Sequence, residues 1–376
     1  MYPRLNALPC LVASVCLLAL CASSAWSAVL PDWTCFRGTP YLKGDLGGPF
    51  SDRPKLLWTK DIGGAVESTA AVVGGVVYVG NADGQLVALN LKDGSRKWVY
   101  NATDKITASP CVTNGLVCVG DEGGVFHAVK ASTGKLAWKY TTGDKIISSA
   151  TPYRGSVLLG SYDNYLYRFD TATGSKIWSF RTDAQVHCTP CVIGGTAIID
   201  GCDGILRMID VERGREKSSA EIGGNYAASP AYSQGAVFVG SMNGEYFGVR
   251  VSDGKILWRV ISRKNGGASF GSGAVSGNYV VFGSRNKSVF CLDRDTGTTR
   301  WVFRTRGEVD SSPVIAGSRV FVGCDDGAVY GLNLSDGKQI WKFTAGSRIA
   351  SSPAFGEKGT RMVIGADDGA VYCFGR

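Results

Sequence analysis

The stretch AVKASTGKLAW, residues 128–138, is one copy of a pattern that recurs along most of this 376-residue chain. In each copy a glycine ends a polar turn, and in nearly every copy a tryptophan follows four positions later. The glycines are Gly94, Gly134, Gly174, Gly214, Gly254, Gly297 and Gly337. The tryptophans are Trp98, Trp138, Trp178, Trp258, Trp301 and Trp341, with Trp58 as an N-terminal member. Successive glycines lie 40, 40, 40, 40, 43 and 40 residues apart, so the chain has a repeat architecture.

One repeat contains four short segments with the composition of β-strands, separated by turn residues. In residues 146–180 we predict strands at Ile146–Thr151, Ser156–Ser161, Tyr165–Asp170 and Lys176–Phe180. No segment keeps a helical period. Four antiparallel strands in each of about eight repeats predict an all-β fold, an eight-bladed β-propeller of four-stranded antiparallel blades.

The two ends of the chain predict how the ring closes. Val371–Arg376 matches the third strand of a repeat that lacks its fourth, whereas Pro54–Lys60 is a fourth strand without a repeat of its own. We expect this N-terminal strand to complete the last blade, which removes free sheet edges. The predicted organisation is therefore a signal peptide at 1–27, an N-terminal extension at 28–53, and one propeller domain at 54–376.

The N-terminus has the features of an export signal. Arg4 is followed by the apolar run Leu11–Cys21, and Ala28 follows a small-residue cleavage site. We expect an exported protein, periplasmic or associated with the outer membrane, with no transmembrane segment in its mature chain. Cys21 lies in a weak match to a lipoprotein box, so lipidation there is an alternative to a free periplasmic protein.

The charge and the cysteines limit the classes of partner and cofactor. The net charge of +8 comes from scattered lysines and arginines, so we expect no nucleic-acid binding, although an anionic lipid or polysaccharide partner stays open. Only two histidines occur, His127 and His187, which argues against a histidine-rich metal centre. We interpret the repeated Asp-Gly pairs as turns, and we interpret Cys188 and Cys191 as buried core cysteines. Cys111 and Cys118 should be cross-strand neighbours, with a disulfide left open.

We interpret the tryptophans as residues that dock one blade onto the next, because an indole buries a large area and carries a hydrogen-bond donor. These docking residues are Trp58, Trp98, Trp138, Trp178, Trp258, Trp301 and Trp341. The copy at Gly214 has Ser218 instead. We therefore expect the weakest blade packing there.

The motif resembles the tryptophan-docking repeat of the PQQ-like, or quinoprotein-like, propeller family. The segment DWTCFRG at residues 32–38 is similar to the start of exported bacterial members. The resemblance implies one of two functions. One branch of the family holds dehydrogenases that bind pyrroloquinoline quinone and calcium, and another holds cofactor-free scaffolds of the BamB type, which serve outer-membrane protein assembly.

The sequence lacks the adjacent cysteine pair that often lies over the quinone and the Cys-x-x-Cys-His motif of covalent haem. We therefore predict a cofactor-free, monomeric, protein-binding scaffold of the cell envelope, with no catalytic, cofactor or metal residues. The alternatives are a PQQ- and calcium-dependent oxidoreductase and a binder of cell-envelope polysaccharide.

A ring of polar residues is the candidate binding site. The position seven residues after each tryptophan should lie at one mouth of the central channel. The candidates are Lys105, Lys145, Gln185, Asn225, Glu308 and Arg348, with Asp310 nearby. Such a ring could hold an anionic ligand or a peptide, and its alternative interpretation is a solvated rim.

Overall fold

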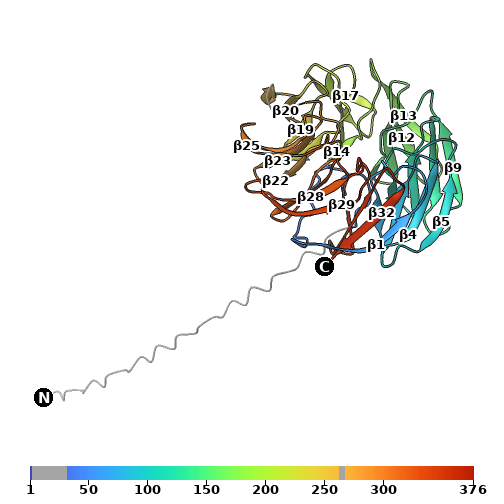
Figure 1. Cartoon of the computed structure of the whole chain (residues 1–376). Coiled ribbons are helices and arrows are strands. Elements are labelled where there is room, and N and C mark those ends of the chain that lie inside the picture. Colours follow the sequence, from blue (N-terminus) through green and yellow to red (C-terminus); the bar gives the residue numbers. More distant parts are fainter. Residues whose placement is uncertain (2–31, 262–266) are drawn as a thin grey trace.

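A computed structural model describes residues 1, 32–261 and 267–376, and in these residues eight separate four-stranded sheets form a ring (Figure 1). Neighbouring strands in every sheet are antiparallel. The predicted eight-bladed propeller is confirmed. The predicted signal peptide at 1–27 and the lipidation candidate Cys21 lie outside the described residues. Among the described residues, no helix has the length and apolar character needed to cross a membrane.

The blades are numbered here in chain order, and their strands run from the channel outward. Blade 1 consists of β2 Ala71–Val73, β3 Val76–Gly80, β4 Gln85–Asn90 and β5 Arg96–Asn101, and blade 2 consists of β6 Cys111–Thr113, β7 Leu116–Gly120, β8 Val125–Lys130 and β9 Leu136–Thr141. Blade 3 consists of β10 Thr151–Tyr153, β11 Ser156–Gly160, β12 Tyr165–Asp170 and β13 Lys176–Arg181, and blade 4 consists of β14 Cys191–Ile193, β15 Thr196–Ile199, β16 Ile205–Asp210 and β17 Arg215–Glu221. Blade 5 consists of β18 Ala231–Ser233, β19 Ala236–Gly240, β20 Glu245–Arg250 and β21 Ile256–Ile261, and blade 6 consists of β22 Ala274–Ser276, β23 Tyr279–Ser284, β24 Ser288–Asp293 and β25 Thr299–Arg304. Blade 7 consists of β26 Val314–Ala316, β27 Arg319–Gly323, β28 Ala328–Asn333 and β29 Gln339–Thr344. Blade 8 consists of β30 Ala354–Gly356, β31 Arg361–Gly365 and β32 Ala370–Gly375, with β1 Lys55–Asp61 outermost.

The N-terminal strand completes the last blade, as predicted. β1 pairs antiparallel with β32, with Lys55 opposite Gly375 and Asp61 opposite Ala370. Figure 1 shows this contact as a blue strand beside a red one. The two ends of the repeat region therefore share one sheet, and the ring is held by backbone hydrogen bonds between residues that are more than 300 positions apart.

The core lies between neighbouring blades because the middle strands of each blade are buried on both faces. Phe126 of β8 and Phe169 of β12, for example, meet across the interface of blades 2 and 3 with ring centroids 5.7 Å apart. The outermost strands consist mostly of exposed and half-buried residues. The turn before each outermost strand requires glycine for two reasons, its backbone conformation and the close approach of a tryptophan ring. Gly134 has a φ of 71°, and a Cβ on it would lie 2.7 Å from the Trp98 ring of the preceding blade.

The innermost strand of blade 3 is shorter than predicted and lies nearer the C-terminus. Instead of Ile146–Thr151, the structure pairs only Thr151–Tyr153 with β11, and Tyr153 belongs to the strand rather than to the turn. The reason is that the preceding amides bond to other segments. The Ile146 N–H donates to the Asp121 carbonyl of blade 2, and the Ser149 N–H donates to the Thr189 hydroxyl of blade 4.

The extension before β1 crosses one face of the ring and touches most of the blades. Its backbone carbonyls accept hydrogen bonds from the innermost strands of six blades, namely blades 1, 2, 4, 5, 6 and 7. These pairs, written as donor and acceptor, are Val72 and Trp33, Val112 and Thr34, Val192 and Pro40, Tyr232 and Tyr41, Val275 and Lys43, and Ile315 and Gly44. Its last residues are held by an ion pair of 2.8 Å between Asp52 and Arg319. The segment predicted only as an extension is therefore a strap across the propeller.

Candidate functional site

A closed ring of eight hydrogen bonds encircles the central channel. Each blade contributes one serine or threonine, and the backbone N–H of each such residue donates to the side-chain hydroxyl of the equivalent residue in the next blade. The donor-to-acceptor distances lie between 2.9 and 3.3 Å. The members, in order, are Thr69, Ser109, Ser149, Thr189, Ser229, Ser272, Ser312 and Ser352, whose N–H returns to Thr69. These hydrogen bonds therefore connect each blade to the next around the channel wall.

The ring surrounds a cavity of about 170 Å³, and the strap covers one end of it. All eight hydroxyl residues line this cavity, together with Phe36 of the strap. The neighbouring Arg37 is fully buried, and its Nη2 donates to the Gly273 carbonyl at 2.9 Å. Burial without a carboxylate partner lowers the pKa of Arg37 to about 9. Phe36 therefore caps the channel on the strap side.

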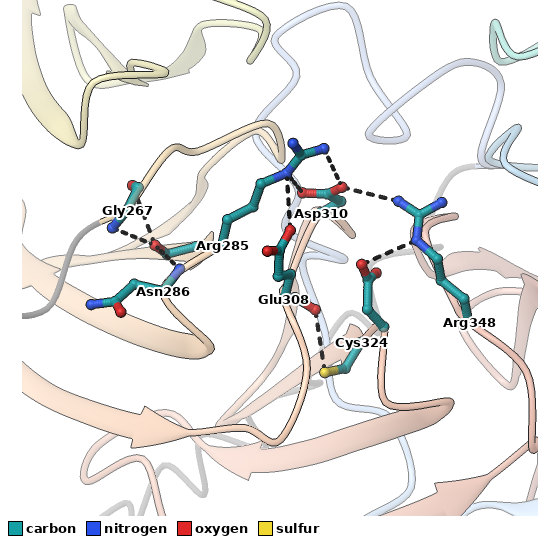
Figure 2. Close-up of polar contacts among 9 residues, drawn as sticks. Gly267, Arg285, Asn286, Glu308, Asp310, Cys324 and Arg348 are labelled. Carbon is teal, nitrogen blue, oxygen red and sulfur yellow. Dashed lines mark hydrogen bonds and ion pairs between the residues drawn. The ribbon is translucent and has the colours of Figure 1, made fainter.

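The opposite end of the channel opens into a polar cavity of about 300 Å³, the channel mouth. An ion-pair cluster forms one side of it (Figure 2). Arg285 pairs with Asp310 at 2.8 Å and with Glu308 at 3.4 Å. Arg348 reaches the same Asp310 at 3.0 Å. The Arg285 guanidinium also lies 3.6 Å from the centroid of the Phe270 ring. Asp310 is therefore held between two cations.

Arg348 gathers three carboxylates from three loops. Besides Asp310, its guanidinium lies 3.1 Å from Asp325 and 3.3 Å from Asp367. Burial disfavours the Arg348 cation, but hydrogen bonds and charge from Asp325 and Asp367 outweigh that effect and raise its pKa. Burial raises the pKa of Asp325 despite the pairing with Arg348. Arg348 therefore neutralises a group of carboxylates that would otherwise repel one another.

The other side of the mouth carries a half-buried histidine, His187. His187 Nδ1 lies 2.6 Å from the Tyr162 hydroxyl, and the Lys145 ammonium lies 4.6 Å from the centroid of the Tyr162 ring. Burial, and then the positive charge of Lys145, lowers the pKa of His187 to about 4. His187 is therefore neutral at neutral pH. Nearby, Lys105 pairs with Glu122 at 3.1 Å.

The six candidate mouth residues occupy equivalent positions in the ring. The backbone carbonyl of each accepts a hydrogen bond from the turn between the second and third strands of its own blade. The pairs, written as candidate and donor, are Lys105 and Glu122, Lys145 and Tyr162, Gln185 and Cys202, Asn225 and Met242, Glu308 and Asp325, and Arg348 and Asp367. Their side chains have different partners. Glu308 and Arg348 belong to the ion-pair cluster around Asp310, whereas Lys105 lies beside Glu122 and Lys145 lies beside Tyr162.

The pattern of sequence positions did not identify Arg285, Phe270 or Glu67 as mouth residues. Arg285 comes from the turn between strands two and three, and the prediction considered only the segment that enters the innermost strand. Glu67 lies two positions after the candidate register, as Asp310 does, and both line the mouth. A search of the position two residues after the candidate register in every repeat would have identified Glu67 and Asp310.

The tryptophans lie between blades. Six indole N–H groups donate to a backbone carbonyl of the following blade at 2.7 to 2.9 Å. The pairs are Trp58 and Leu91, Trp98 and Ala131, Trp138 and Thr171, Trp178 and Val211, Trp258 and Arg294, and Trp301 and Leu334. Trp341 packs edge-on against Phe374 of blade 8 with centroids 5.4 Å apart.

The cysteines form no disulfide in the described residues. Cys111 and Cys118 are cross-strand neighbours as predicted, and both thiols are free. Cys188 and Cys191 are buried and free as well. Beside them, the Asp200 carboxyl is fully buried with neither oxygen hydrogen-bonded in the described structure, and burial raises its pKa to about 8. Among the described residues, no group of three or more His, Cys, Asp or Glu side chains is arranged to hold a metal ion.

The sequence of this chain matches a known protein family. The family model described as outer membrane protein assembly factor BamB matches residues 52–111, 101–249 and 248–374. A comparison with the curated proteins gave no match.

Solved structures of several kinds share the fold. BamB from Moraxella catarrhalis superposes with a TM-score of 0.75 at 18% identity, covering 86% of this chain and 100% of its own. The quinohemoprotein alcohol dehydrogenase from Comamonas testosteroni superposes with a TM-score of 0.80 at 14% identity, covering 93% of this chain and 81% of its own. The computationally designed protein Ika8 gives 0.76 at 17% identity, covering 86% and 100%. At these identities the structural matches show the fold alone.

Proposed function

The chain belongs to the family described as outer membrane protein assembly factor BamB, and from that membership we propose that it is an exported, cofactor-free protein-binding scaffold of the cell envelope. Its partners in this proposal are components that assemble outer-membrane proteins. The observation that carries the proposal is the family match, whose three segments together span 52–374 and so include every blade.

The channel mouth is the binding surface in this proposal. It brings charged side chains from several loops to one rim, where a partner can meet them, whereas Phe36 of the strap covers the other end of the channel. Arg348 and Glu308 lie within the ion-pair cluster, and Lys105 lies beside Glu122. Complementary charges of this kind set orientation and association rate at protein interfaces. A charged loop of a partner protein is the ligand that fits such a rim.

The quinoprotein oxidoreductase is the second candidate, since such enzymes share the fold. The residues of the channel do not fit its cofactors well. At the mouth, Asp310 is already paired with Arg285 and Arg348, so its oxygens are engaged rather than turned toward a calcium site. These contacts support the scaffold over the dehydrogenase.

Site-directed photo-crosslinking in intact cells tests the proposal. A photoreactive amino acid is placed at Gln185, which belongs to the candidate mouth ring and is uncharged, so the replacement breaks no ion pair. The control places it at Asp336, an exposed residue of the turn before β29. We expect covalent capture of an outer-membrane assembly protein from Gln185 and not from Asp336. Capture from neither position, together with stoichiometric quinone in the purified protein, would contradict the scaffold.

A further inference from the structure

The passage from the channel mouth to the hydroxyl ring is lined by the residues that stand two positions before the ring members. Three of the residues that line both cavities are apolar, namely Ile147, Phe270 and Ala350, and two are carboxylates, namely Glu67 and Asp310. The ring members line only the inner cavity, which Phe36 closes. A ligand that enters from the mouth therefore meets an apolar and acidic wall before it reaches the hydroxyls.

Glu67 is the carboxylate of this passage that is left without a cation. Asp310 is held by two arginines, and Glu122, at the mouth, pairs with Lys105. Glu67 makes no ion pair among the described residues. Although solvent reaches its side chain, desolvation by the channel wall raises the pKa of Glu67, and the charge of Asp367 raises it further. A cation carried in by a ligand would therefore be stabilised beside Glu67.

The charges around Glu67 favour a cation as well. In the ion-pair cluster, Arg285 contacts two carboxylates and Arg348 contacts three, with Asp310 shared between them (Figure 2). Two guanidinium groups therefore face four carboxylates, and Glu67 adds a fifth negative charge. The ammonium of Lys145 lies on the other side of the mouth, over a tyrosine ring. A cleft with an excess of one charge attracts ligands of the opposite charge, so this side of the mouth attracts cations.

The hydroxyl ring supplies polar acceptors at the inner end of the passage. Each hydroxyl oxygen accepts one backbone N–H and keeps a second lone pair, and its O–H can rotate away from the channel axis. No member of the ring is more than 5% exposed. A primary ammonium has three rotatable donors, which suit acceptors placed all round a channel, whereas a planar guanidinium suits a single bidentate carboxylate.

We propose that the channel takes up the side chain of a lysine from the partner protein, with its ammonium between Glu67 and the hydroxyl ring. The methylene groups of this lysine would lie against Ile147, Phe270 and Ala350. A lysine joins an apolar stem to a compact charged head, and the passage offers an apolar wall followed by polar acceptors. This inference rests on the proposed function, because it takes the channel mouth as the partner's binding surface, and it adds which group of the partner enters.

The probe for this site is N-acetyl-lysine-methylamide, titrated into the full protein while NMR follows the methyl resonances of Ile147 and Ala350. We expect saturable shifts of these methyl groups. N-acetyl-norleucine-methylamide has the same stem without the ammonium and should give none. Sodium sulfate tests the rival occupant, an anion inside the hydroxyl ring. Equal shifts from the norleucine probe, or saturable shifts from sulfate and none from lysine, would overturn the proposal.

Two variants test the role of Glu67. Glu67→Gln keeps the shape of the side chain but removes its charge, and it should weaken lysine binding about fivefold, the effect of one solvent-accessible ion pair. The matched control is Glu221→Gln, at an exposed glutamate of the outermost strand β17, which should bind the probe as the wild type does. Equal affinities of the two variants would refute the assignment to Glu67.

The lysine site and the scaffold function can fail separately. Capture of an assembly protein from Gln185 without binding of the lysine probe would refute the lysine site and leave the scaffold standing. Binding of the lysine probe that Glu67→Gln weakens, without capture from Gln185, would support the site and count against the scaffold.

Discussion

Replacing Ser149 with alanine should destabilise the whole propeller, because the Ser149 hydroxyl is one link in the ring around the channel. The Ser109 N–H donates to this hydroxyl at 2.9 Å, and both residues are buried. Ser149→Ala removes the acceptor while the donor stays buried. The loss of a partner by a buried backbone N–H costs about 1–3 kcal/mol, more than a typical hydrogen bond contributes. The free energy of unfolding should fall by that amount.

The matched control is Ser149→Thr, which keeps the hydroxyl. Threonine already serves at two positions of the same ring, Thr69 and Thr189, so it fits the register. Urea denaturation of the wild type and both variants gives the three free energies of unfolding. Ser149→Thr should be more stable than Ser149→Ala, because it keeps the hydroxyl that accepts the Ser109 N–H. If Ser149→Ala is as stable as Ser149→Thr, the ring of hydrogen bonds contributes nothing and the reasoning is refuted.

Three further predictions concern other parts of the ring. Trp138→Phe removes the donor to the Thr171 carbonyl and should lower the free energy of unfolding by about 1–3 kcal/mol in urea denaturation; a neutral effect would argue against docking. Asp200 has a folded pKa of about 8, above its unfolded value, so the stability that its neutral form supports is lost as pH rises from about 4 to 8. The advantage of Asp200→Asn should therefore grow by about 1.4 kcal/mol per pH unit in that window, and a pH-independent difference would contradict it. Of the nine cysteines in the described residues, Cys202 is half-buried and the other eight are buried, so Cys202 should react with a thiol reagent before those eight, as peptide mapping can show.

The architecture could be predicted because one local rule repeats. Gly134 must take a positive φ and must also lie against Trp98, so the spacing of glycine and tryptophan encodes both the turn and the contact with the neighbouring blade. The same logic applied to Pro54–Lys60 predicted the closure with β32. The hydroxyl ring was also within reach, since a serine or threonine stands at one position of every repeat, but its role becomes visible only when the blades are placed side by side.

The strap and the ion-pair cluster follow from no repeat. Phe36 has no equivalent in the blades, so no internal comparison indicates that it caps the channel. The cluster depends on where turns from different blades meet. Arg285, Asp310 and Arg348 come from different repeat positions, and only the packing of neighbouring blades brings both arginines within 3.0 Å of Asp310. Sequence periodicity predicts positions around a ring, not which side chains reach across it.

The most direct test of the scaffold is the composition of the native protein after gentle purification from its own cell envelope. Quantitative mass spectrometry and absorbance spectroscopy of that sample report its partners and any bound quinone together. The account predicts outer-membrane assembly proteins in stoichiometric amounts, reduced by Arg348→Glu at the channel mouth, and no quinone absorbance. Stoichiometric pyrroloquinoline quinone with calcium, and no protein partner, would contradict it.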